Sequence, residues 1–183
     1  MKTRTAASIF TVGVLALAAA LPAHATLRSF TTTLTGAAET PPTGSAATGS
    51  ALVVFDDVLS SVTVSLTFAG LSAPASAGHI HCCTAPGTNV GVALGFTGFP
   101  AVSSGTYTNT FLAGAYTGAN TFASVLAGTI AGQSYVNVHN ANFPGGEIRG
   151  FLVAAVPEPS TYALMLGGMA LVAGAARRRV TRG

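Results

Sequence analysis

Two histidine-bearing segments contain the residues best suited to chemistry. Residues 78–83 read GHIHCC, and residues 135–139 read YVNVH. In a β-strand, residues two apart lie on the same face, so His79 and His81 would project side by side while Ile80 faces the core. A His-x-His pair on one strand is a common source of two imidazole ligands for zinc or copper.

His139 is the candidate third ligand. By the same alternation, Tyr135, Asn137 and His139 share one face of their strand, and the two valines between them face the other way. His139 would join His79 and His81 if the two strands lie close together. The sequence therefore offers a candidate copper or zinc site. The competing interpretation is that these histidines only satisfy backbone groups at strand ends.

Cys82 and Cys83 are the only cysteines in the sequence. An oxidising compartment outside the cytoplasm would favour a disulfide. Adjacent cysteines can bond to each other only with local strain, because ordinary disulfides prefer a larger Cα separation than one peptide allows. The alternatives are a bond to another chain, ligation of a metal beside the histidines, and a disulfide without function.

The sequence argues against an enzyme. It contains no Gly-x-Ser-x-Gly, no His-Glu-x-x-His and no phosphate-binding glycine loop. The interior carboxylates are Glu39, Asp56, Asp57 and Glu147. Asp56 and Asp57 are adjacent, so on a strand they would face opposite sides and could not act as an acid/base pair. Glu147 and Arg149 are two apart, and we expect a surface ion pair of little energetic weight. Metal-dependent redox chemistry is the alternative.

The elements that would position these residues are short strands. The predicted strands are 28–35, 51–55, 61–68, 134–139 and 147–153. Residues 61–68 alternate apolar side chains with Thr and Ser, the period of a half-buried strand. Residues 56–57 and 140–146 read as connections, and only 119–126 has helical leanings. We therefore expect an all-β domain, an antiparallel β-sandwich or open barrel with at most one short helix.

Charge is scarce and is concentrated at the two ends. Charged residues make up 7% of the chain, against about 25% in an ordinary soluble domain. Residues 26–156 hold four carboxylates and two arginines, a net charge of −2. A nucleic-acid-binding domain needs a basic patch to displace phosphate counterions. Nucleic acid is therefore excluded as a partner.

Residues 1–25 have the three parts of a secretory signal peptide. Lys2 and Arg4 come first, an uncharged apolar stretch covers 6–21, and Ala23 and Ala25 supply the small residues that a signal peptidase recognises. We expect the secretion machinery to export the chain and signal peptidase to cleave it before Thr26. The mature domain would then cover residues 26–155.

Residues 156–183 form a second organised segment. The order is Pro157, Glu158 and Pro159, then an apolar stretch at about 160–176, then Arg177, Arg178 and Arg179. As a helix, this stretch would span roughly 25 Å at about 1.5 Å per residue, a little less than the ~30 Å hydrocarbon core. The arginines would stay on the cytoplasmic side. This pattern predicts a marginal membrane-spanning helix that anchors the chain at least transiently.

That order of features resembles the PEP-CTERM sorting signal. The resemblance implies recognition and cleavage by an exosortase-type membrane protease, in Gram-negative bacteria that make exopolysaccharide. A permanent single-span anchor is the alternative. Either way, we expect the protein in the cell envelope or at the extracellular surface.

Four segments of the interior resemble the CHRD domain, which is named for its repeats in chordin. They are residues 34–42, 78–81, 135–140 and 143–150. The resemblance implies an extracellular β-rich module without established enzymatic activity in bacteria. The sequence departs from the pattern at Cys82 and Cys83, where a small or polar residue usually follows the second histidine. We expect an exported, non-enzymatic binding or structural module of the envelope or extracellular matrix with a polysaccharide or protein ligand. The alternative is a copper- or zinc-binding sandwich with redox activity.

Overall fold

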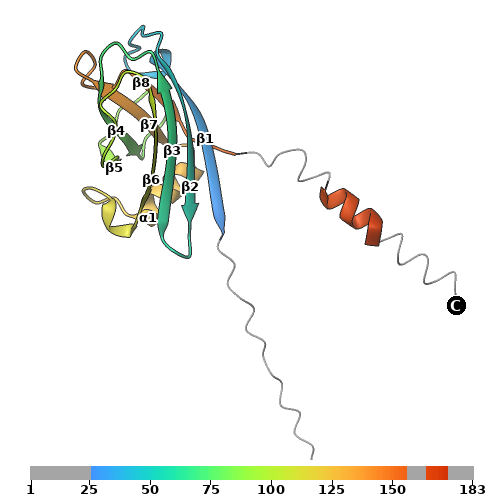
Figure 1. Ribbon diagram of the computed structural model, residues 1–183. Coiled ribbons are helices and arrows are strands. Elements are labelled where there is room, and N and C mark those ends of the chain that lie inside the picture. The colour runs from blue at the N-terminus through green and yellow to red at the C-terminus, as the bar shows by residue number, and fades with distance from the viewer. Residues whose placement is uncertain (1–25, 156–163, 173–183) are drawn as a thin grey trace, which may run out of the picture.

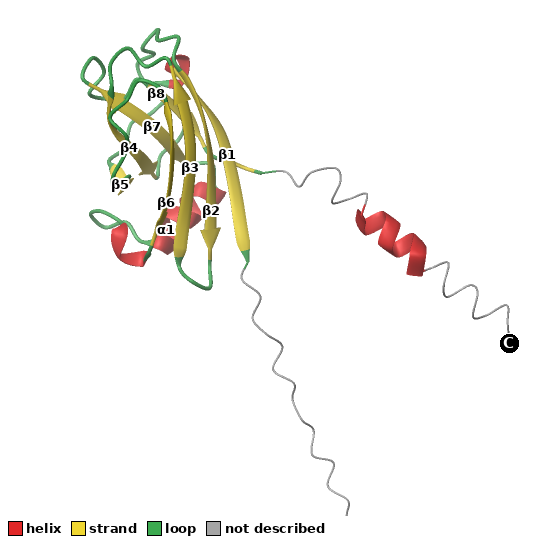
Figure 2. Cartoon of the chain, in the orientation of Figure 1, coloured by secondary structure: helices red, strands yellow, loops and turns green. Residues whose placement is uncertain are grey.

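The computed structural model describes residues 26–155 and 164–172 of the chain. The first range forms a β domain with one α-helix (Figures 1 and 2). Its strands are β1 (Leu27–Thr35), β2 (Thr48–Asp56), β3 (Ser61–Ala69), β4 (Ala75–Cys82), β5 (Val92–Gly95), β6 (Gly105–Phe111), β7 (Ser134–Asn140), β8 (Ile148–Phe151) and β9 (Val153–Ala154). The helix is α1 (Phe122–Ile130), and short 3-10 turns cover Gly36–Ala38 and Ala113–Ala115.

The strands form one antiparallel sheet that curls on itself into a half-barrel. The order across it is β5-β4-β7-β8-β1-β2-β3-β6, with β9 beside β1. The long strands β1, β2 and β3 make one wall, and the strands β4, β5, β7 and β8 lie behind them (Figure 1). Aromatic rings hold the two ends of the sheet together: Phe96, after β5, stacks on Tyr107 of β6 at 5.4 Å between centroids. This confirms the expected open barrel.

The core lies on the inner face of this curl. Val62, Val64 and Leu66 of β3 are buried, while Thr63 and Ser65 between them are partly exposed. Fully burying each such apolar side chain stabilises the fold by about 1.5–3 kcal/mol. The expected hairpin at residues 56–57 is also confirmed, because Asp56 Oδ1 accepts hydrogen bonds from the backbone of Val58 and Leu59 at 3.0 and 2.9 Å. This closes the turn between β2 and β3.

The helix begins three residues later than the sequence suggested. Thr121 is its N-cap: the Thr121 side chain accepts from the Ser124 backbone at 3.1 Å, and the Ser124 side chain accepts from the Thr121 backbone at 2.9 Å. This reciprocal capping box ends the extended chain at Thr121. The helix then continues to Ile130, four residues beyond the expected end.

The described helical residues 164–172 fall inside the apolar stretch expected at 160–176. The expected signal peptide, and the sorting residues Pro157, Glu158, Pro159, Arg177, Arg178 and Arg179, lie outside the described residues. Over the two described ranges, every helix is too short or too polar to cross a bilayer.

Candidate metal centre

Strands β4 and β7 bring the three histidines together. They pair antiparallel, with His79 opposite Asn137 and His139 opposite Ala77. Side chains on one face of such a pair are direct neighbours. Ile80, Val136 and Val138 are fully buried in the apolar core, as the alternation predicted. The condition on which a third ligand depended, that the two strands lie close, is therefore met.

The ring nitrogens lie at ligand spacing. His79 Nδ1 is 3.0 Å from His139 Nε2, and one nitrogen from each of His79, His81 and His139 lies within 4.8 Å of the others. Ligand atoms bound at about 2.0–2.1 Å in a tetrahedral zinc centre lie roughly 3.3–3.4 Å apart. The three imidazoles could thus close on one ion with small rotations of their rings.

Backbone carbonyls fix which nitrogen of two histidines carries the proton. His81 Nδ1 donates to the Val90 carbonyl at 2.7 Å, and His139 Nδ1 donates to the Pro144 carbonyl at 2.9 Å. A carbonyl oxygen can only accept, so both Nδ1 atoms are protonated and the Nε2 atoms of the neutral rings are bare. Each Nε2 therefore presents a lone pair to the centre of the cluster, the arrangement found in metal-binding histidines.

Burial keeps these imidazoles neutral. It lowers the pKa of His79 to about 4, with further contributions from the neighbouring His139 and His81. Burial also lowers the pKa values of His81 and His139, despite the opposing effect of the hydrogen bonds to Val90 and Pro144. Neutral imidazole is the form that binds metal, so the cluster is ready for an ion at neutral pH.

Asn137 completes this group, which we call the histidine cluster: His79, His81, His139 and Asn137. Asn137 Oδ1 lies 2.9 Å from His139 Nε2 and 3.1 Å from His81 Nε2. All three atoms are acceptors, and a proton on His79 Nδ1 can serve the contact with His139 alone. Buried acceptors that face one another without a proton are costly. A cation at their centre would remove this cost.

An aromatic ring joins the histidine cluster to a second polar group. The Tyr135 ring stacks on His81 with centroids 4.6 Å apart and planes 5° from parallel. The guanidinium carbon of Arg149 lies 4.8 Å from the centroid of Tyr135. We call Arg149, Glu39, Thr40 and Asn89 the arginine cluster. The two clusters are therefore in contact through one side chain.

The expected surface ion pair between Glu147 and Arg149 is wrong. Both side chains are fully buried, and Arg149 Nε faces Glu39 Oε2 instead, at 3.5 Å. Glu147 accepts from the Ser72 backbone at 3.0 Å and from the Ser45 hydroxyl at 2.6 Å. The reason is the strand order, which places β8 between β7 and β1, inside the sheet. The sequence analysis did not identify Glu39 as the ion-pair partner of Arg149.

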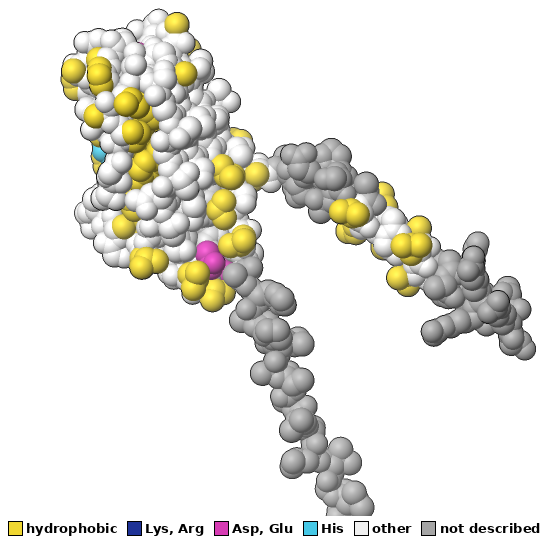
Figure 3. Space-filling model, in the orientation of Figure 1, with side chains coloured by type: hydrophobic (Ala, Val, Ile, Leu, Met, Phe, Trp, Pro, Cys, Tyr) yellow, Lys and Arg dark blue, Asp and Glu magenta, His cyan; other side chains and the backbone are white. Residues whose placement is uncertain are grey.

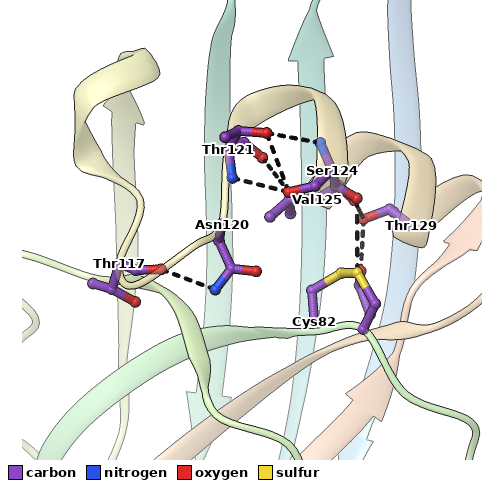
Figure 4. The surroundings of a disulfide bond; sticks show 9 residues. Cys82, Thr117, Asn120, Thr121, Ser124, Val125 and Thr129 are labelled. Atoms are coloured by element: carbon purple, nitrogen blue, oxygen red, sulfur yellow. Dashed lines mark hydrogen bonds between the residues drawn. A yellow bond between two sulfur atoms is a disulfide. The ribbon is translucent and has the colours of Figure 1, made fainter.

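The two cysteines are bonded to each other at the end of β4. The disulfide lies beneath α1 (Figure 4), and Cys83 Sγ is 3.7 Å from the Ser124 carbonyl oxygen. A side chain at Gly128 of α1 would overlap both sulfur atoms. Neither sulfur is free to bind a metal or a second chain, so the disulfide serves as a surface on which the helix packs.

Comparison with known families places these features in context. The model of the CHRD domain matches residues 30–152, which include the whole histidine cluster, and the PEP-CTERM protein-sorting motif matches residues 155–179. No curated protein and no solved structure matches the chain significantly. The sorting motif supports export, sorting to the cell envelope and processing by an exosortase. The chain therefore belongs to the CHRD domain family, and a PEP-CTERM sorting motif follows its domain.

Proposed function

We propose that this protein is a non-enzymatic binding module of the cell envelope whose domain holds a copper or zinc ion through His79, His81 and His139. The observation that carries the proposal is the convergence of bare imidazole nitrogens. Hydrogen bonds to Val90 and Pro144 use the outer nitrogens of two rings and leave the inner ones unprotonated. Imidazole ligands suit zinc and copper, and neutral ones need no proton release on binding.

The competing interpretation is that the histidines only satisfy backbone groups. It explains the contacts of one nitrogen in each of two rings, the Nδ1 atoms of His81 and His139, which donate to backbone carbonyls. It leaves the inner nitrogens facing Asn137 Oδ1 at 2.9 and 3.1 Å, acceptor against acceptor. A bound cation explains the contacts of both the Nδ1 and the Nε2 atoms.

The low charge of the surface supports a role outside the cell, in contact with an uncharged partner. The face in Figure 3 carries very little charge apart from one acidic spot. Exposed threonines and serines project from β1, β2, β3 and β6, and line a depression of about 670 Å³ with Leu52 and Val153. Hydroxyl groups without charges suit an uncharged polysaccharide or a protein of the extracellular matrix. The metal would stabilise the module, and this outer face would contact the partner.

Elemental analysis tests the proposal. We would express the full chain with export, purify it in detergent, offer it copper and zinc, and compare it with a His79→Ala/His81→Ala double variant. A matched control replaces Thr63 and Ser65, which are likewise two apart on one strand. We expect close to one metal ion per chain in the wild type and control, and none in the double variant. Metal-free wild-type protein after loading would contradict the proposal.

A further inference from the structure

On the basis of the proposed metal site, we infer that Asn137 supplies the fourth ligand through Oδ1. The centre would then be a closed four-coordinate site of three imidazole nitrogens and one amide oxygen. Asn137 Oδ1 lies 2.9 Å from one bare Nε2 and 3.1 Å from another. His79 Nδ1 lies 3.0 Å from the first of these. Three edges of the group are therefore each slightly shorter than the roughly 3.3 Å edge of a tetrahedral centre.

The opposite end of the amide lies on the side of Glu39. A Cβ at Gly146 would lie 2.8 Å from Asn137 Nδ2 and in closer contact with Glu39 Oε1. Glu39 Oε1 is buried and has no hydrogen-bond partner among the described residues. The amide nitrogen thus lies on the side of a carboxyl oxygen that can accept, and the amide oxygen lies on the side of the imidazoles. Turning the amide over would set its oxygen toward the carboxyl group.

A fourth protein ligand decides what kind of centre this is. Structural metal sites are closed by four protein ligands, whereas catalytic sites keep one position for water or substrate. With Asn137 bound, the ion has no open position. The centre therefore holds its ion as part of the fold, in agreement with a binding module that is not an enzyme.

Cobalt(II) and azide test this assignment. Cobalt replaces zinc and reports its coordination in the visible spectrum, and azide binds only where a position is open. We expect that azide leaves the spectrum of the cobalt-loaded full chain unchanged. In Asn137→Ala, azide should change the spectrum, and the Kd for cobalt should rise at least about tenfold. Asn109→Ala, on β6 and half-exposed, is the matched control and should behave as the wild type.

The outcomes separate this inference from the metal site itself. If azide changes the wild-type spectrum, the site is open and Asn137 is not a ligand, although the histidines still bind. If no protein binds cobalt, the proposed metal site fails. Asn137→Asp covers the case in which the alanine variant does not fold, since a carboxylate keeps the shape. It should stay insensitive to azide with a shifted spectrum, and an unshifted spectrum would overturn the assignment.

Discussion

The histidine cluster and the arginine cluster lie side by side in one sheet but compensate their buried polar atoms differently. In the arginine cluster the cation is part of the chain. Arg149 Nε donates to the Ala38 carbonyl at 2.6 Å, and its terminal nitrogens donate to Asn89 Oδ1 at 2.8 Å and to Thr40 Oγ1. In the histidine cluster the acceptors converge in the same way with no cation of the chain between them.

The difference explains why one cluster would need an ion and the other does not. Buried oxygen and nitrogen acceptors require a donor or a positive charge. Arg149 supplies that charge from within the chain, so this cluster has its cation without taking one from solution. Under the proposed function, the histidine cluster would take its charge from solution as a metal ion. Asn137 and Arg149 are direct cross-strand partners, so the histidine cluster and the arginine cluster are adjacent on β7 and β8.

Removing the built-in cation should have the largest effect. Arg149→Met leaves Glu39 and the oxygens around it buried without compensation, and we expect a loss of about 3–5 kcal/mol in the free energy of unfolding. Urea unfolding measures it. The double variant Glu39→Gln/Arg149→Met should recover part of the loss because it also removes the carboxylate. A single variant within about 1 kcal/mol of the wild type would show that the comparison is wrong.

Adding the missing cation should come next. At a free zinc concentration one hundred times the Kd, a site present only in the folded chain adds about 2.7 kcal/mol to the free energy of unfolding. The His79→Ala/His81→Ala variant should gain nothing. Calorimetry with zinc and with a chelator makes the measurement. Equal gains in the two proteins would mean that zinc binds elsewhere.

Gly146 lies between the two clusters, so a methyl group there should disturb both. Its φ of +122° disfavours an L side chain, and its Cβ would press on Asn137 Nδ2 and Glu39 Oε1. We expect Gly146→Ala to cost about 2 kcal/mol of stability and to weaken metal binding. Gly145→Ala is the control, because open space surrounds that position. A Gly146 variant as stable as the control would show that this contact is loose.

The smallest effect should appear as opposite pH dependences in metal-free protein. Burial raises the pKa of Glu39 from 4.5 to about 7, against the attraction of Arg149. The Glu39 contribution to stability is therefore present below pH 4.5 and is lost as the pH rises to 7. The depressed pKa of His79 has the other sign, since stability falls as the pH drops from 6.5 towards 4. Glu39→Gln should steepen the acid-side loss, measured by urea unfolding at several pH values with chelator present. An unchanged slope would argue against a buried titrating carboxyl.

The local geometry of the site could be predicted from the sequence, and its long-range parts could not. Strand alternation correctly separated His79 and His81 from Ile80, and Asn137 and His139 from the valines between them. Alternation acts within one strand. The pairing of β4 with β7 joins residues about 60 positions apart, which no local pattern specifies. The hydrogen bonds that expose the Nε2 atoms come from backbone carbonyls, which leave no signal in side-chain identity.

The arginine cluster shows the same limit more strongly. Arg149 and Glu39 are separated by 110 positions, and their contact depends on β8 lying beside β1. The sequence offered Glu147 as the nearer partner, and two-residue spacing on a strand does place side chains on one face. Burial of the strand decided the outcome. Strands β5 and β6 were missed because the first is only four residues long and the second alternates Thr with few apolar residues.

The two-residue strand β9 has a mechanical consequence. Val153 and Ala154 pair with Thr31 and Phe30, and the Ala155 backbone donates to Ser29 at 2.9 Å. Any tension on the residues after Ala155 enters the domain through this strand, where few hydrogen bonds share the load. The nine-residue ladder between β1 and β2 shares its load over many more. Under a pulling force, β9 should therefore separate from β1 first. The fully buried side chain of Leu152 should then resist further unfolding, because it must leave the core before the chain can extend. Strand β9 can thus detach from β1 while both polar clusters stay folded.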